Sequence, residues 1–290
     1  MDLDVFDDHP CALGEGPLWD TRSQELVWVD ILGPEVHRRR LDSDSTRTST
    51  EVTHPIGSLA MHPEGGWLAV ESRGVGTFDG HRSQLRWSFE EIDGRPPPTP
   101  VRGNDCGVDP DGRLWFGTIA WDMSPDAAAL YRLDDLEEPP VRVLGDVSIS
   151  NGIGWSPDGA TLYYIDSATR RIDRFAYHVD TGTASDRRPL VHIPAGAGDP
   201  DGLAVDASGA VWVALFGGAA LHRYTPSGKL DTVLDLPVAN PTSCAFIGAD
   251  LSRLAVTSAH VELPQPDALQ GTTLVVDVPT AGLPVPALRG

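Results

Sequence analysis

The sequence reads Asp109-Pro110-Asp111-Gly112-Arg113-Leu114-Trp115-Phe116 near its middle, which is a turn signal followed by a short apolar run. Asp, Pro and Gly favour tight turns, whereas Leu, Trp and Phe suit the buried surface of a β-sheet. Two strands joined by such a turn form a β-hairpin. The stretch therefore predicts a hairpin whose second strand begins at Leu114.

The same pattern occurs six times along the chain. The apolar runs begin at residues 26, 67, 114, 162, 211 and 254, so the repeat spans 41 to 49 residues. A four-stranded blade of a β-propeller occupies roughly 40 to 50 residues. The repeat predicts an all-β, six-bladed β-propeller with four-stranded antiparallel blades around a central channel. We expect residues 1–290 to form this single domain.

The same repeat could also form a β-solenoid that does not close, or a pair of β-sandwiches. Closure is favoured because it leaves only short, protected sheet edges. Residues 2–8 can pair with the last blade and so lock the ring. The segment Pro96-Pro97-Pro98-Thr99-Pro100 is typical of a domain linker, but the repeat continues across it, and we expect an inter-blade loop there.

Composition limits the partners and the compartment. The formal net charge of −20 would repel nucleic acid and anionic membrane surfaces, so neither is expected as a partner. Cys11, Cys106 and Cys244 are widely separated and form no CxxC pair, which predicts free thiols in a reducing compartment. Because the first residues also lack the pattern of a signal peptide, we expect a cytoplasmic protein.

Four polar residues occupy the same position in four different repeats. They stand five residues before the first residue of the turn, and they are Glu15, Asn104, Asn151 and Asp201. Each one alone is explained by turn geometry. Their shared offset favours a common site instead, because the first strand of every blade lines the channel of a propeller. Two carboxylates on one axis repel each other unless a cation or a shared proton lies between them.

This set of oxygen ligands favours a hard divalent cation. Calcium, magnesium and manganese prefer such ligands, and zinc also accepts carboxylates. An incomplete protein ligand set leaves positions for water or substrate, which suits catalysis. Arg102, two residues before Asn104, either reaches substrate at the mouth of the channel or forms a surface ion pair. The nine histidines show no metal-ligand spacing, which predicts surface or packing roles for them.

The same residues lie in motifs that resemble the senescence marker protein 30, gluconolactonase and luciferin-regenerating enzyme-like family. The resemblance covers nearly the whole chain, through motifs at 13–19, 102–115, 150–167, 200–206 and 241–246. It implies a six-bladed propeller with one catalytic divalent metal ion. We expect this ion to be calcium, before zinc, manganese or magnesium. The metal ligands that the resemblance implies are Glu15, Asn151 and Asp201.

The resemblance also implies how substrate is held. Asn104 becomes a substrate contact beside the metal, and Arg102 matches a position that contacts sugar hydroxyls. Asp122 falls where sugar lactonases of the family carry an acidic substrate contact, although Thr118-Ile119-Ala120-Trp121-Asp122 departs from the usual sequence.

The expected activity is the hydrolysis of a small-molecule sugar lactone, similar to gluconolactone, to its hydroxy acid. The metal would polarise the lactone carbonyl, and Asp201 would accept a proton from the attacking water. One alternative is an organophosphate or other ester hydrolase that uses the same metal site. The other is a calcium-binding propeller without turnover.

Overall fold

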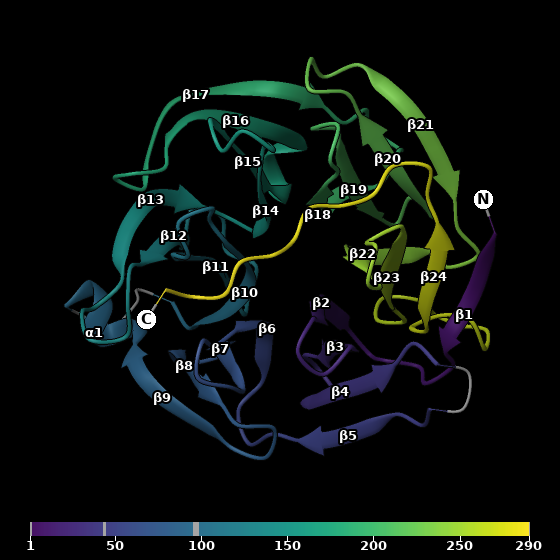
Figure 1. The fold of residues 1–290 in the computed structure, drawn as a ribbon, viewed down its shortest axis with the longest axis horizontal. Coiled ribbons are helices and arrows are strands. Elements are labelled where there is room, and N and C mark those ends of the chain that lie inside the picture. The colour runs from purple at the N-terminus through teal and green to yellow at the C-terminus, as the bar shows by residue number, and fades with distance from the viewer. Residues whose placement is uncertain (1, 43–44, 95–98, 290) are drawn as a thin grey trace.

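Six sheets stand radially around a central axis (Figure 1). The computed structural model describes residues 2–42, 45–94 and 99–289. Within these residues each sheet has four strands, and consecutive strands of a sheet are antiparallel. The prediction of a six-bladed, all-β propeller with four-stranded antiparallel blades is confirmed.

Each blade runs outward from an inner strand that faces the axis. Blade 1 contains β2 (Gly14–Asp20), β3 (Glu25–Asp30), β4 (Glu35–Arg40) and β5 (Thr48–Glu51). Blade 2 contains β6 (Ile56–Met61), β7 (Trp67–Glu71), β8 (Gly74–Phe78) and β9 (Ser83–Ser88). Blade 3 contains β10 (Val101–Val108), β11 (Leu114–Ala120), β12 (Ala128–Leu133) and β13 (Val141–Val147).

The second half of the chain repeats this arrangement. Blade 4 contains β14 (Ser150–Trp155), β15 (Thr161–Asp166), β16 (Arg171–His178) and β17 (Thr183–His192). Blade 5 contains β18 (Asp199–Val205), β19 (Val211–Phe216), β20 (Ala220–Tyr224) and β21 (Leu230–Asp235). Blade 6 contains β22 (Asn240–Ile247), β23 (Arg253–Ala259), β24 (Thr273–Asp277) and β1 (Leu3–Asp7). The helices within the described ranges are α1 (Phe89–Asp93) and the 3-10 turn η1 (Ser167–Thr169).

The ring closes through strands from both ends of the chain. β1 pairs antiparallel with β24, with Leu3 opposite Val276 and Val5 opposite Leu274. The inner strands also contact one another in cyclic order, including β2 with β22. The expected pairing of residues 2–8 with the last blade is therefore confirmed for β1. The predicted inter-blade loop at 96–100 falls largely on residues 95–98, which lie outside the described residues.

The repeated turn and the strand after it support each other. Asp206 accepts hydrogen bonds at Oδ1 from the backbone N–H groups of Ser208 (2.9 Å) and Ala210 (3.1 Å), which closes the turn. Its other oxygen accepts from Nε1 of Trp212 at 3.2 Å, and this Trp is fully buried in β19. The turn residue thus also satisfies the polar atom of the next strand's largest side chain.

The hydrophobic core lies between neighbouring blades. Middle strands such as β3, β11 and β19 are buried along almost their whole length, because each sheet packs against another on both faces. Outer strands such as β5 and β21 are mostly exposed. No helix among the described residues is long and apolar enough to cross a membrane. All three cysteines are free, as the sequence predicts.

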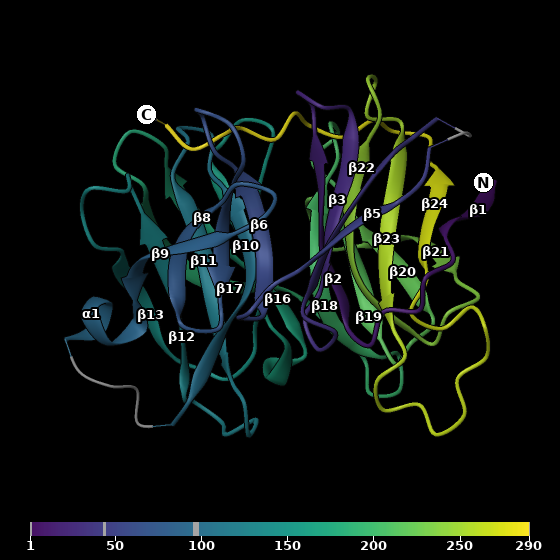
Figure 2. The ribbon, with the colours of Figure 1, turned by 90° about the horizontal axis from the view of Figure 1, so that it is seen from below.

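The chain after β24 crosses one end of the central channel, at the top of Figure 2. Hydrogen bonds attach it to several blades in turn: Ala207 N–H donates to Ala281 O at 2.8 Å, Leu288 N–H to Met61 O at 3.2 Å, and Arg289 N–H to Gly112 O at 2.8 Å. This C-terminal segment, residues 278–289, therefore covers the end of the channel at which the inner strands finish.

Candidate active site

A cavity of about 480 Å³ opens where the inner strands begin, at the end of the channel opposite the C-terminal segment. Its lining includes Glu15 of β2, Arg102 and Asn104 of β10, Asn151 of β14 and Asp201 of β18. All five side chains are at most 8% exposed. The structure thus brings together every predicted site residue except Asp122.

Two acidic side chains dominate the electrostatics of this cavity. Burial raises the pKa of Glu15 to about 8, and the charge of Asp105 adds to this rise. Burial and the charge of Glu15 raise the pKa of Asp201 well above its ordinary value. Because these raised pKa values already include the opposing effect of Arg102, both carboxyl groups ionise at neutral pH only with further positive charge beside them.

Arg102 is a buried cation that opposes the rise in both carboxyl pKa values but does not cancel it. Burial lowers its pKa to about 10, while the charges of Glu15 and Asp201 act in the opposite direction, so the guanidinium stays cationic at neutral pH. It lies over the ring of Trp121, 5.6 Å from the centroid. The alternative of a surface ion pair is wrong, because Arg102 is only 8% exposed and faces the cavity.

A chain of hydrogen bonds fixes the two carboxamides. Arg102 Nη1 donates to Asn104 Oδ1, and Asn104 Nδ2 donates to Asn151 Oδ1 and to the carbonyl of Ser150. Asn151 Nδ2 in turn donates to Ser167 Oγ at 2.8 Å, and that hydroxyl donates to Pro200 O at 2.6 Å. With its Nδ2 committed, Asn151 has only its carbonyl oxygen to offer a cation, and that oxygen, which accepts from Asn104, keeps a second lone pair.

The residues present fit a hard divalent cation. Among the described residues, none donates a hydrogen bond to the Asp201 carboxylate, and Glu15 accepts one only from the N–H of Gly16, at 3.1 Å. Two buried carboxylates with free lone pairs, beside one carboxamide oxygen, are the oxygen donors that such cations prefer. A cation there would also offset the burial, and the repulsion between the acidic groups, that raise both carboxyl pKa values.

Asp122 lies at the rim and not in the cavity lining, although its neighbours Trp121 and Met123 do line the cavity. The Asp122 carboxylate accepts hydrogen bonds from Ser124 N–H at 3.0 Å and Thr99 Oγ at 3.3 Å. The bonds with Ser124 are the main reason that its pKa is lowered. Its contact with substrate stays a prediction.

The sequence did not reveal the contributions of Ser167 and Asp105. Ser167 orients Asn151 from the end of the neighbouring strand, and its place at the end of the motif at 150–167, directly after an apolar strand, assigned it no role. Asp105 follows Asn104, so strand alternation turns its side chain away from that of Asn104. Burial raises the Asp105 pKa to about 6.

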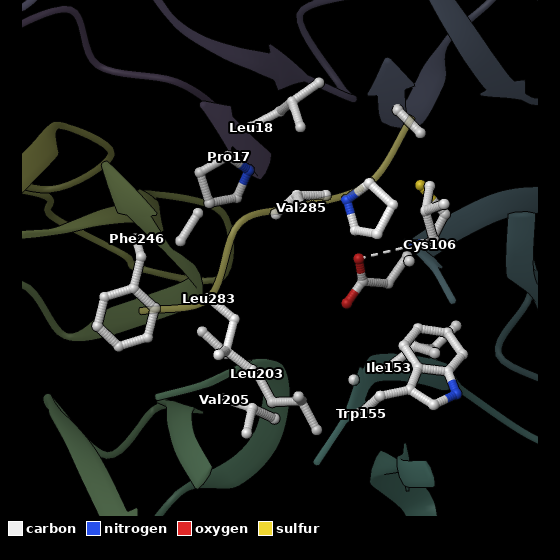
Figure 3. A pocket seen from close by; sticks show the side chains of 18 of the residues that line it. Pro17, Leu18, Cys106, Ile153, Trp155, Leu203, Val205, Phe246, Leu283 and Val285 are labelled. Carbon is white, nitrogen blue, oxygen red and sulfur yellow. Dashed lines mark hydrogen bonds between the residues drawn. The ribbon is translucent and has the colours of Figure 1, made fainter. Parts of the chain in front are cut away.

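Asp105 lines a second cavity of about 410 Å³ at the other end of the channel. Figure 3 shows this cavity, with Ile153, Trp155, Leu203, Val205 and Phe246 around it. Leu283 and Val285 of the C-terminal segment cover it. The second cavity is therefore apolar except for Asp105 and a few small groups.

The sequence of this chain is similar to a known protein family and to several named proteins. The profile of the family described as SMP-30/Gluconolactonase/LRE-like region matches residues 13–260. The chain is 34% identical to a 6-deoxy-6-sulfogluconolactonase of Pseudomonas putida, over 87% of this chain and 85% of that protein. It is 35% identical to the pentonolactonase XacC of Haloferax volcanii, over 87% and 83%.

A solved structure agrees with the fold along the whole chain. It is a calcium-binding protein, regucalcin, from Agrobacterium tumefaciens, with a TM-score of 0.89 and 30% identity. The match covers 99% of this chain and 97% of that one.

Proposed function

The chain belongs to the SMP-30/gluconolactonase/LRE-like family, and from this premise we propose that it is a metal-dependent hydrolase that opens a sugar lactone to its hydroxy acid. The observation that carries the proposal is the pair of buried carboxylates of Glu15 and Asp201, which lie with Asn151 and the cationic Arg102 in one cavity. The names of two relatives, both sugar lactonases, support the substrate class.

Glu15, Asn151 and Asp201 would hold one divalent cation through their side-chain oxygens. When bound, the cation supplies Lewis-acid polarisation of the lactone carbonyl and lowers the pKa of a water molecule. We propose calcium first, because the donors are all oxygen and because a relative of known structure is a calcium-binding protein.

The protein's own side chains then transfer the proton and hold the metal ligands in position. Asp201 accepts a proton from the attacking water as the water oxygen bonds to the carbonyl carbon. The bond from that carbon to the ring oxygen breaks, and the ring oxygen takes the proton from Asp201 and becomes the hydroxyl of the product. One water is consumed for each lactone opened. Ser167 keeps Asn151 in the orientation that its role requires.

Arg102 and Asn104 are placed to orient the sugar. Arg102 donates a hydrogen bond to Asn104, and its guanidinium lies over the ring of Trp121. Their polar groups are therefore held in position before substrate binds. A cavity of about 480 Å³ lies within the range of about 300–1,000 Å³ of small-molecule sites. We propose that Asp122 completes the set from the rim, where its carboxylate is exposed.

The test is a lactone panel on metal-stripped and metal-reloaded protein. Gluconolactone, xylonolactone and a phosphotriester are offered with calcium, magnesium, manganese or zinc, and acid release is followed with a pH indicator. We expect lactone turnover that is lost on stripping and restored by one equivalent of cation. Turnover of every lactone without metal, or of none with any metal, would contradict the proposal.

The same panel separates the other candidate functions. Turnover of the phosphotriester alone would identify the organophosphate hydrolase. Tight calcium binding with no turnover would identify a calcium-binding propeller, a candidate that the regucalcin structure favours. In either case the cation would still bind at Glu15 and Asp201.

A further inference from the structure

A second group of metal-ligating side chains lies at the outside of the ring, where the chain passes from blade 6 to blade 1. Glu35 and His37 stand two residues apart in β4, so strand alternation places them on the same face. His9 lies between β1 and β2. The sequence predicted only surface or packing roles for these histidines, because 27 residues separate them. We call these three residues the seam cluster.

The distances within the seam cluster suit a metal ion. His9 Nε2 lies 3.7 Å from Glu35 Oε2, and His37 Nε2 lies 3.6 Å from the same oxygen. All three ligand atoms are within 4.8 Å of one another. These separations exceed those of hydrogen bonds. In a tetrahedral zinc site, each ligand atom lies about 2.0–2.1 Å from the metal, which places neighbouring ligand atoms roughly 3.3–3.4 Å apart. The two distances in the seam cluster are close to this spacing.

His37 is the buried member of the seam cluster, and one of its ring nitrogens lacks a hydrogen-bond partner among the described residues. Its side chain is 0% exposed, and among the described residues its Nε2 has no hydrogen-bond partner. Its Nδ1 lies 2.9 Å from Ser49 Oγ, and its ring packs 5.3 Å from that of Trp28. When Nδ1 donates to Ser49, Nε2 carries the lone pair and points at Glu35, as metal-bound imidazoles commonly do.

The surroundings leave the cluster open to an ion. The side chains of His9 and Glu35 are 34% and 25% exposed, so an ion can enter from solvent and keep a water as its fourth ligand. The positive charge of Arg47 acts on His37, but Arg47 is paired with Asp7 at 2.6 Å, which reduces its repulsion of a cation. Asp7 also accepts from the N–H of His9 at 3.2 Å and so positions that residue.

We propose that His9, Glu35 and His37 bind one zinc ion at the seam of the ring, separate from the cation of the central channel. Two imidazoles and one carboxylate are a ligand set typical of zinc, whereas calcium and magnesium prefer oxygen donors. The ion would join the segment after β1 to β4. Since β1 belongs to blade 6 and β4 to blade 1, zinc would fasten the closure of the propeller.

The experiment measures zinc and cobalt binding on the full chain after metal stripping. An Asp201→Asn background weakens the channel site, so that the seam cluster is measured without it. We expect one equivalent of zinc, a rise in Tm on binding, and the visible absorption of tetrahedral cobalt when cobalt is used. His9→Gln and Glu35→Gln should each weaken zinc binding by about 100-fold or more.

His81→Gln is the matched control, because His81 is exposed on a loop outside the cluster. It should bind zinc as the unsubstituted background does. Equal zinc affinity in His9→Gln and His81→Gln, or no zinc equivalent in the Asp201→Asn background, would overturn the proposal. In otherwise wild-type protein loaded with calcium, His9→Gln should leave lactone turnover unchanged, so this test is independent of the proposed lactonase activity.

Discussion

The two ends of the central channel are built from the same inner strands but carry opposite chemistry. At the starts of β2, β10, β14 and β18 stand carboxylates, carboxamides and a guanidinium. Farther along the same strands stand apolar residues such as Leu18, Ile153 and Leu203, under the C-terminal segment. Within these strands, position along the strand therefore separates the polar end of the channel from the apolar end that the C-terminal segment covers.

Asp105 is the exception that links the two ends. Its side chain lines the apolar cavity, yet its charge raises the pKa of both Glu15 and Asp201. The channel thus holds three buried acidic groups within electrostatic reach of one another. The polar end can keep its carboxylates ionised only if positive charge is concentrated there, so substitutions of single charged residues should affect that end and not the apolar end.

Asp201→Asn should have the largest effect, because it removes a proposed cation ligand and the proposed proton acceptor together. We expect kcat/KM on the best lactone to fall by about 10³-fold or more, with the fold retained. Steady-state kinetics and circular dichroism measure the two parts. Asp277→Asn, at an exposed strand end, is the control and should change kcat/KM less than about twofold. A comparable loss in both variants would mean that the polar end is not where lactone is opened.

Metal removal should make stability depend on pH. In the stripped protein, the raised pKa of Glu15 means that its contribution to stability is complete below its ordinary value of 4.5 and is lost as pH rises through about 8. We expect a loss on the order of 3 kcal/mol between pH 5 and 8, and little loss with calcium bound. Urea unfolding at several pH values measures this. Stripped Glu15→Gln should show a flatter profile, and an unchanged profile would contradict the assignment.

Leu288→Ala tests the closed end. Leu288 is 4% exposed and packs into the core beside blades 2 and 3. We expect a loss of about 2–3 kcal/mol in the free energy of unfolding, with kcat/KM changed less than about twofold. Val285→Ala, at a residue 43% exposed, should cost less than about 1 kcal/mol. A large loss of turnover in Leu288→Ala would show that the two ends do not act separately.

The fold and part of the site can be predicted from the sequence because both depend on a pattern that repeats locally. Turn residues and apolar runs repeat locally, so the six blades and the ring that holds Glu15, Asn104, Asn151 and Asp201 follow from spacing alone. Other features depend on segments that meet only after closure. Ser167 reaches Asn151 from the end of the neighbouring strand, and the C-terminal segment crosses several blades without any repeated pattern.

Burial was equally hidden in the sequence. A guanidinium on a strand is usually solvated, and only closure of the ring makes Arg102 a buried cation beside two carboxylates. The seam cluster has the same origin, because pairing of β1 with blade 6 carries His9 past β4. Local spacing thus predicts equivalent positions, while contacts between the first and last parts of the chain require the closed ring.

Asp122→Asn should have the smallest effect on lactone turnover, because Asp122 lies at the rim of the polar cavity. One hydrogen bond that a sugar hydroxyl donates to an exposed carboxylate contributes about 0.5–1.5 kcal/mol, so we expect KM to rise by about 3- to 10-fold while kcat stays within about twofold. Asp126→Asn, exposed four residues farther along, is the control. If both variants keep the original KM, the sugar does not reach Asp122. Substrate recognition would then end at Trp121, whose ring lies beside Arg102 inside the cavity.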